Sequence, residues 1–335
     1  MRTLVTGATG FIGRHLVRRL VGRGDQVKCL VRRPSQNGLA STGVELVLGD
    51  LTRPESLQNA VRGVDLVFHV AGATQVHTSR TYARVNSEGT RHLAEACDRV
   101  LSPPKLVYVS SLAAAGPSRP DSPRREGQPP APVSAYGRSK LVAEGHLQKL
   151  AAVVPITVVR PPIVYGPGDP HSFPVFSSVR KGFNVVPSRV DPSMSFIYVE
   201  DLVSALLLAG ERGRTLPPRH TGQDAEEGIY FAGSDESLTF SGMGLAAARA
   251  LNVPAIRTVR LPMLLCWLGA YINQFRALLM HKPIIFTVDK VREALAGSWI
   301  CSSDKAKAEL GLKCSTNLAD GFRLTGEWYR RQGWL

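Results

Sequence analysis

The sequence predicts an α/β protein with a doubly wound parallel sheet and a smaller, mixed C-terminal domain. Two observations indicate this fold. Strand-like apolar runs alternate with helix-like periodic runs through the first half, and a glycine-rich turn separates the first strand from the first helix. With 335 residues, 44% of them hydrophobic and 20% charged, the chain is long enough for one sizeable domain and a smaller one.

The elements follow one another in a regular order. A short apolar strand opens the chain at residues 2–6, and the periodic run Phe11 to Leu20 predicts the helix after it. Further strands are expected at Gln26–Val31, Val44–Leu48, Asp65–Val70, Leu106–Ser110 and Ile156–Arg160. This alternation indicates βαβ units, hence a Rossmann sheet covered on both faces, with a ligand at the carboxyl ends of the strands.

The expected domain boundary follows the last of these strands. Residues 1–165 are expected to form the Rossmann domain, with returning segments near 195–233. Residues 166–335 are expected to form mainly the substrate-binding domain.

The glycine-rich turn contains Gly7, Gly10 and Gly13. Backbone N–H groups and the positive end of a helix dipole hold a pyrophosphate at such a place. Gly7 allows the turn, Gly10 the close approach of phosphate, and Gly13 the packing of helix on strand. The spacing differs from the usual Gly-x-Gly-x-x-Gly, so the triplet alone does not establish a dinucleotide site.

The residues that follow the other strands agree with that position. They are Arg32 and Arg33 after the second strand, Asp50 and Leu51 after the third, Ala71 and Gly72 after the fourth, and Ser110 and Ser111 after the fifth. A protein that binds NAD usually has an acid at the end of the second strand, whereas an arginine there can pair with a 2′-phosphate. NADP is therefore the preferred cofactor, and NAD stays open.

Tyr136 and Lys140 are four residues apart in a predicted helix, so their side chains share one face. An ammonium beside a phenol lowers the phenol pKa from about 10 toward working pH, which a proton-transfer group needs. A tyrosine and a lysine on a solvated helix are the alternative. The glycine turn upstream and the serine pair that ends the intervening strand favour the catalytic interpretation.

A set of segments spread over nearly the whole chain carries a family resemblance. They are Thr6–Gly13, Gly49–Leu51, His69–Gly72, Asn86–Thr90, Tyr108–Ser111, Tyr136–Lys140, Arg160–Pro167 and Phe196–Leu202. With them the chain resembles the extended short-chain dehydrogenase/reductase family, also called the NAD-dependent epimerase/dehydratase family. Ser110–Pro117 and the region from Ser298 to Leu335 are similar to its 3β-hydroxysteroid dehydrogenase-like branch.

The resemblance implies roles for named residues. Tyr136 would be the catalytic acid/base, Lys140 would lower its pKa and hold the nicotinamide ribose, and Ser111 would bind the reacting oxygen, with Ser110 as its alternative. The resemblance and the positions of residues at the strand ends together give the expected cofactor contacts. These are Gly7, Thr9, Gly10, Phe11, Ile12, Gly13, Arg32, Arg33, Asp50, Leu51, Ala71, Gly72, Tyr136, Lys140, Pro162 and Ile163. No metal is expected.

The expected chemistry is hydride transfer between a nicotinamide and a secondary alcohol or ketone. Enzymes of the nucleotide-sugar branch carry an Asn where this chain has Ile163, and an Arg where it has Met194-Ser195. Both family residues serve the diphosphate, although Arg189 could substitute. An apolar, sterol-like or isoprenoid substrate is therefore preferred. A nucleotide-sugar epimerase or dehydratase is the alternative enzyme, and a cofactor-binding scaffold without turnover is the alternative of another class.

The run Leu261 to Met280 has one charged residue, Arg276. Polar residues interrupt it, so it does not predict a membrane span, which needs ~20 mostly apolar residues. Core helices are one interpretation. A lipid-facing lid or a membrane-surface patch is the other, and it leaves peripheral membrane contact open.

The formal net charge of +14 is spread along the chain without a nucleic-acid-binding motif, so a small-molecule substrate and no nucleic-acid partner is expected. The five cysteines match no zinc or redox motif, which favours reduced thiols. A strand directly after Met1 leaves no room for a signal peptide and predicts a cytoplasmic location, with membrane association left open. A homodimer is left open as well.

Overall fold

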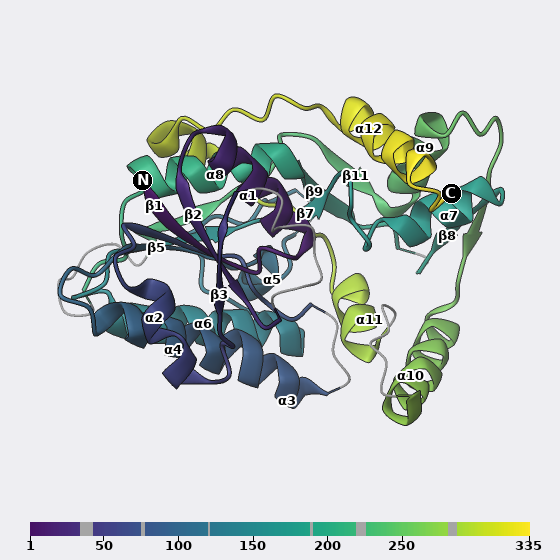
Figure 1. Cartoon of the computed structure of the whole chain (residues 1–335). Coiled ribbons are helices and arrows are strands. Elements are labelled where there is room, and N and C mark those ends of the chain that lie inside the picture. Colours follow the sequence, from purple (N-terminus) through teal and green to yellow (C-terminus); the bar gives the residue numbers. More distant parts are fainter. Residues whose placement is uncertain (34–42, 75–77, 120, 188–189, 219–225, 281–286) are drawn as a thin grey trace.

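The computed structural model describes the chain except for residues 34–42, 75–77, 120, 188–189, 219–225 and 281–286 (Figure 1). In the described part, seven strands form one parallel sheet in the order β10-β6-β5-β4-β1-β2-β3. The strands are β1 (Arg2–Thr6), β2 (Gln26–Val31), β3 (Glu45–Leu48), β4 (Leu66–His69), β5 (Lys105–Val109), β6 (Ile156–Arg160) and β10 (Ile229–Phe231). The strand order reverses between β1 and β4, which confirms the doubly wound Rossmann fold.

Helices cover both faces of this sheet (Figure 1). One layer contains α1 (Phe11–Gly22), α8 (Val199–Arg212) and η4 (Ala306–Leu310), and the other contains η2 (Pro54–Ser56), α2 (Gln58–Val61), α4 (Gly89–Asp98) and α6 (Ala135–Leu150). Neighbouring strand residues divide between the layers because successive side chains point to opposite faces. Val5 is buried in the core with α1 and α8, and Leu4 in the core with α4 and α6.

Short elements at the carboxyl edge of the sheet prepare the site. They are α3 (Ser79–Tyr82), η3 (Ala83–Glu88) and α5 (Leu112–Ala115). The strands expected from the sequence agree with the observed ones to within one residue at each end, and α1 extends two residues past its expected end. The π-helical turn η3 was not foreseen.

Two smaller sheets lie toward the C-terminal part of the chain. In the order β11-β9-β7, β9 (Ser193–Tyr198) pairs with β7 (Ile163–Tyr165) in parallel and with β11 (Ser237–Thr239) in antiparallel fashion. The other sheet pairs β8 (Phe183–Val186) with β12 (Arg257–Arg260).

Three helices, α7 (Phe173–Arg180), α9 (Phe240–Ala250) and α12 (Leu318–Arg331), surround an aromatic core beside these sheets. In that core the ring centre of Phe322 lies 5.0 Å from Tyr165 and 5.7 Å from Phe176. The mixed architecture of this part agrees with expectation, and the boundary after residue 165 stays a prediction.

The apolar run near residue 270 forms one helix, α10 (Met263–Met280), which Figure 1 shows at the edge of the molecule beyond α11 (Val288–Leu295). Cys266 and Ala270 pack against Val288 and Val291 of α11. Large apolar side chains among the other described side chains of this helix are exposed, namely Met263, Leu264, Leu265, Leu268, Tyr271, Ile272 and Phe275. The core-helix interpretation is therefore wrong for this surface. Among the described helices, none has the length and apolar character to span a membrane.

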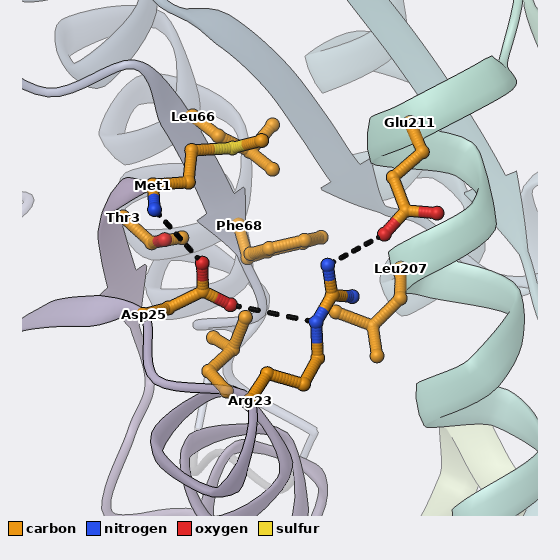
Figure 2. A pocket seen from close by; sticks show the side chains of 9 residues that line it. Met1, Thr3, Arg23, Asp25, Leu66, Phe68, Leu207 and Glu211 are labelled. Carbon is orange, nitrogen blue, oxygen red and sulfur yellow. Dashed lines mark ion pairs between the residues drawn. The ribbon is translucent and has the colours of Figure 1, made fainter.

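A small pocket lies where the strands of the large sheet begin, at the edge opposite their carboxyl ends (Figure 2). Arg23 lies across it, with Nε 3.6 Å from Asp25 and a terminal nitrogen 2.7 Å from Glu211, while the N-terminal amine pairs with Asp25 at 3.1 Å. These ion pairs link the end of α1 to the end of α8. The pocket is thus part of a helix contact and is remote from the carboxyl strand ends.

Candidate active site

Two glycines at the turn between β1 and α1 leave no room for a side chain. Gly7 has a φ of 73°, and a Cβ there would lie 2.6 Å from the backbone nitrogen of Ala71. A Cβ on Gly13 would lie 2.1 Å from the carbonyl oxygen of Gly7. The N–H of Gly10 donates to that same carbonyl at 2.9 Å. The turn is therefore held against both α1 and the loop after β4.

The N-terminus of α1 fits an anionic group. Gly10 is its N-cap in an extended conformation, no side chain caps the helix, and its first turn has no acidic residue. Free N–H groups and the helix dipole favour a phosphate at such an end. Thr9, Phe11 and Ile12 beside it are half-buried, and Gly10 is exposed. The residues present thus fit the pyrophosphate of a dinucleotide.

Arg32 and Arg33 lie exposed at the carboxyl end of β2, next to Asp50 at the end of β3. Asp50 Oδ1 accepts hydrogen bonds from the N–H and the hydroxyl of Thr52, at 2.8 and 2.9 Å. Burial alone would raise the pKa of Asp50, but these bonds and the charge of Arg32 outweigh it, so its pKa lies below the usual value. Leu51 is buried against Gly89. The segment that follows Arg33, residues 34–42, lies outside the described residues.

Lys140 is buried, with 3% of its surface exposed, and reaches the carboxyl edge of the sheet from α6. Its Nζ donates to the carbonyl of Val109 at 2.9 Å, and a Cβ on Gly72 would lie 3.2 Å from Nζ. Burial lowers the pKa of Lys140 to about 8. Gly72 therefore lets the loop after β4 pass beside the ammonium.

The two serines at the end of β5 have different surroundings. Ser110 is buried and its hydroxyl donates to Glu144 at 2.5 Å; Glu144 in turn pairs with buried Arg160 through two hydrogen bonds. Ser111 is half-buried, caps α5, and lies close enough to the phenol of Tyr136 for its hydroxyl to lower the pKa of that phenol. The structure therefore brings Ser111, not Ser110, to Tyr136.

Tyr136 is the second residue of α6 and is half-buried. Burial raises the pKa of Tyr136, the ammonium of Lys290 and the Ser111 hydroxyl partly offset this rise, and Glu293 adds to it. The pKa stays above its usual value, so the phenol is protonated at neutral pH. A protonated phenol can donate to a developing oxyanion.

Pro162 lies between β6 and β7, and Ile163 is the first residue of β7 and is half-buried. Met194 is 2% exposed and belongs to the aromatic core, so its side chain does not face a ligand cleft. Arg189 lies outside the described residues.

Several side chains at this edge carry no role in the sequence analysis. Asn86, in η3, accepts from the N–H of Ala73 at 2.7 Å and donates to the hydroxyl of Ser139 at 3.0 Å, so it ties the loop after β4 to α6. Its motif, Asn86–Thr90, was visible in the sequence. Asp289 and Lys290 contact Tyr136 from α11, and no local pattern marks them.

These features describe an α/β protein with a candidate dinucleotide site and a tyrosine–serine pair at the same edge of the sheet. The sequence matches the NAD dependent epimerase/dehydratase family over residues 3–221, and the chain belongs to this family. It is an NAD-dependent oxidoreductase of the extended short-chain dehydrogenase/reductase type.

Relatives extend the comparison over the full length. Ceramide reductase of Caulobacter vibrioides is 33% identical, over 99% of this chain and 95% of that protein. The 2-alkyl-3-oxoalkanoate reductase of Shewanella oneidensis is 29% identical, over 95% of this chain and 84% of that protein. UDP-glucose 4-epimerase of Thermus thermophilus, solved with NAD, superposes with a TM-score of 0.75 at 26% identity, over 98% and 99% of the two chains.

Proposed function

We propose that this enzyme interconverts a secondary alcohol and a ketone on an apolar substrate, with NADP preferred over NAD. One observation carries the choice of substrate: α10 exposes seven large apolar side chains among its described residues, and α11, on which it packs, contacts Tyr136. An apolar surface is thus connected through α11 to α6, the helix that carries the acid/base. The two reductases named above support the same choice, since their names give ceramide and a 2-alkyl-3-oxoalkanoate.

In the proposed reaction, a bound nicotinamide supplies or accepts the hydride. The turn from Gly7 to Gly13 and the N-terminus of α1 would hold the pyrophosphate of the cofactor. In the reductive direction, the Tyr136 hydroxyl donates its proton to the substrate oxygen, and Ser111 donates a hydrogen bond to the same oxygen. Lys140, beside Gly72, would hold the nicotinamide ribose.

NADP preference rests on Arg32 and Arg33 at the end of β2. Both are exposed, and the carboxylate nearby, Asp50, accepts hydrogen bonds from Thr52. Two guanidinium groups at that place favour a 2′-phosphate through charge-assisted hydrogen bonds.

A nucleotide-sugar epimerase or dehydratase is the second candidate, because solved structures of such enzymes share the fold. The chain has apolar side chains at Ile163 and Met194, and Met194 is buried in the aromatic core. Neither side chain can give a diphosphate a charge-assisted hydrogen bond, so these two positions leave its charge uncompensated. We therefore place this candidate second.

The test compares two panels of compounds. Apolar ketones and alcohols, sterol-like, isoprenoid or long-chain, are mixed with enzyme and cofactor, and nicotinamide absorbance is followed. UDP- and GDP-sugars form the second panel, with melting temperature as an added readout. Turnover of members of the first panel alone is expected, and epimerisation of a nucleotide sugar would promote the second candidate.

We also propose that α10 contacts an anionic membrane surface. Its exposed apolar residues include Leu264, 76% exposed, and Phe275, 64% exposed, and the chain carries a net charge of +14. An apolar helix face on a basic protein binds anionic bilayers by burial and by charge. Sedimentation with phosphatidylglycerol vesicles should fall at least tenfold in Leu264→Glu/Phe275→Glu and not in Leu101→Glu, whose side chain is fully exposed elsewhere. Equal binding of both variants would refute membrane contact through α10.

A further inference from the structure

The helix α11 is attached to the first turn of α6, where Tyr136 lies. Asp289 accepts hydrogen bonds from the backbone N–H of Ala135 at 2.7 Å and of Tyr136 at 3.0 Å, one with each carboxylate oxygen. The first turn of α6 has no acidic residue of its own. Asp289 thus supplies the negative charge that a helix N-terminus favours, and it fixes α11 at the phenol.

Lys290, the next residue, places its ammonium 5.3 Å from the ring centre of Tyr136. Its Nζ also donates to Glu293 Oε2 at 2.7 Å, so the two charges of this pair lie together beside the ring. Burial raises the pKa of Tyr136; Lys290 lowers it, and Glu293 adds to the rise by a smaller amount. The pair therefore acts on the phenol in opposite senses, with the cation dominant.

Besides the Asp289 carboxylate and the Lys140 ammonium, the described titratable groups near this pair include Tyr82 and His171, which carry no charge at neutral pH. The ring of Tyr82 from α3 lies 5.7 Å from that of Tyr136, and burial raises the pKa of Tyr82 far above neutrality. Burial lowers the pKa of His171. The Asp169 carboxylate raises this pKa in part, and the Lys290 ammonium lowers it. Lys140 lies one turn further along α6 and donates to a backbone carbonyl.

We propose that Lys290 is a positioning residue whose ammonium stabilises the negative charge formed on the Tyr136 oxygen during proton transfer. In the reductive direction, the O–H bond of Tyr136 breaks and a new O–H bond forms on the former carbonyl oxygen, while hydride adds to the carbonyl carbon. Lys290 keeps its protons and lies over the ring that becomes anionic. The role of Lys290 in turnover rests on the proposed function. Its effect on the charge of Tyr136 can be measured in the enzyme without substrate or cofactor.

The test reads the charge state of residue 136 directly. Meta-fluorotyrosine is incorporated at Tyr136, its fluorine resonance is followed by NMR as pH rises, and circular dichroism verifies that the fold persists. In Lys290→Gln the titration is expected to move up by about one pH unit, a size set by a unit charge near 5 Å at partial exposure. Lys290→Arg should titrate close to the unmodified sequence, and Glu293→Gln should move the titration down.

Lys149→Gln is the matched control. It removes the same charge from the other end of α6, about 20 Å away by helix geometry, and should leave the titration unchanged. An unshifted titration in Lys290→Gln would overturn the proposal. Should that variant unfold, an unshifted titration in Glu293→Gln would overturn it instead. None of these readouts needs turnover, so failure of the proposed function would show separately, as the absence of ketone reduction.

Discussion

Gly13→Ala tests the cofactor turn most sharply, because the structure fixes the size of the conflict. The added Cβ would lie 2.1 Å from the carbonyl oxygen of Gly7, against 3.4 Å for ordinary contact, so the turn or α1 must move by more than an ångström. Overpacking of this kind costs about 1–3 kcal/mol of stability. A displaced N–H donor also loses a charge-assisted hydrogen bond to phosphate, worth about 1.5–3 kcal/mol. The Kd for the cofactor should therefore rise about ten- to a hundredfold.

The assay is calorimetric or fluorescence titration of NADP and NAD, with melting temperature measured in parallel. Gly22→Ala is the matched control, since Gly22 lies in the same helix and, beyond the backbone of that helix, no atom of the described residues lies within 4 Å of its added Cβ. Alanine there should leave the Kd unchanged and add up to about 1 kcal/mol of stability. A Gly13→Ala variant that binds both cofactors as tightly as the Gly22→Ala variant would refute the placement of the pyrophosphate at this turn.

Three further predictions follow from the site. Tyr136→Phe should reduce turnover by about a hundredfold or more and leave cofactor Kd nearly unchanged, because only the proton-transfer group is lost; retained turnover would exclude Tyr136. Arg32→Asp should weaken NADP far more than NAD in titrations, and equal wild-type affinities for both cofactors would contradict the assignment. The pKa of Lys140 falls from 10.5 to about 8 on folding, so the unfolded chain binds more protons between these values and the free energy of unfolding should rise there with pH, by about 3 kcal/mol in total. Lys140→Met, measured by denaturant unfolding without cofactor, should lack this rise. If the free energy of unfolding changes equally with pH in both proteins, folding does not lower the pKa of Lys140.

The fold was predictable because its signals are local. A strand, a glycine turn and a helix are adjacent in sequence, and the order of elements dictates a parallel sheet with ligands at one edge. That Tyr136 and Lys140 lie on one helix was predictable for the same reason, and both are on α6. The expected lowering of the Tyr136 pKa by Lys140 stays a prediction. The roles assigned to the individual site residues, and a homodimer, stay predictions.

Other features depend on packing that no local pattern reveals. The sequence alone does not decide which of Ser110 and Ser111 lies beside Tyr136. The structure decides it, because the Ser110 hydroxyl donates to Glu144, which is paired with buried Arg160. The contact of Asp289 and Lys290 with Tyr136 joins positions more than a hundred residues apart. The run that forms α10 has the same apolar composition for a buried or an exposed helix, so only the structure decides between them.

The central claim is that hydride passes between a nicotinamide and an apolar ketone beside Tyr136. The most direct measurement uses NADPH carrying deuterium at the transferred position of the nicotinamide ring, a long-chain or sterol-like ketone, and mass spectrometry of the alcohol formed. We predict one deuterium on the carbinol carbon with the wild-type enzyme and essentially none with Tyr136→Phe over the same time. Turnover of a UDP-sugar with no transfer to any apolar ketone would contradict the account.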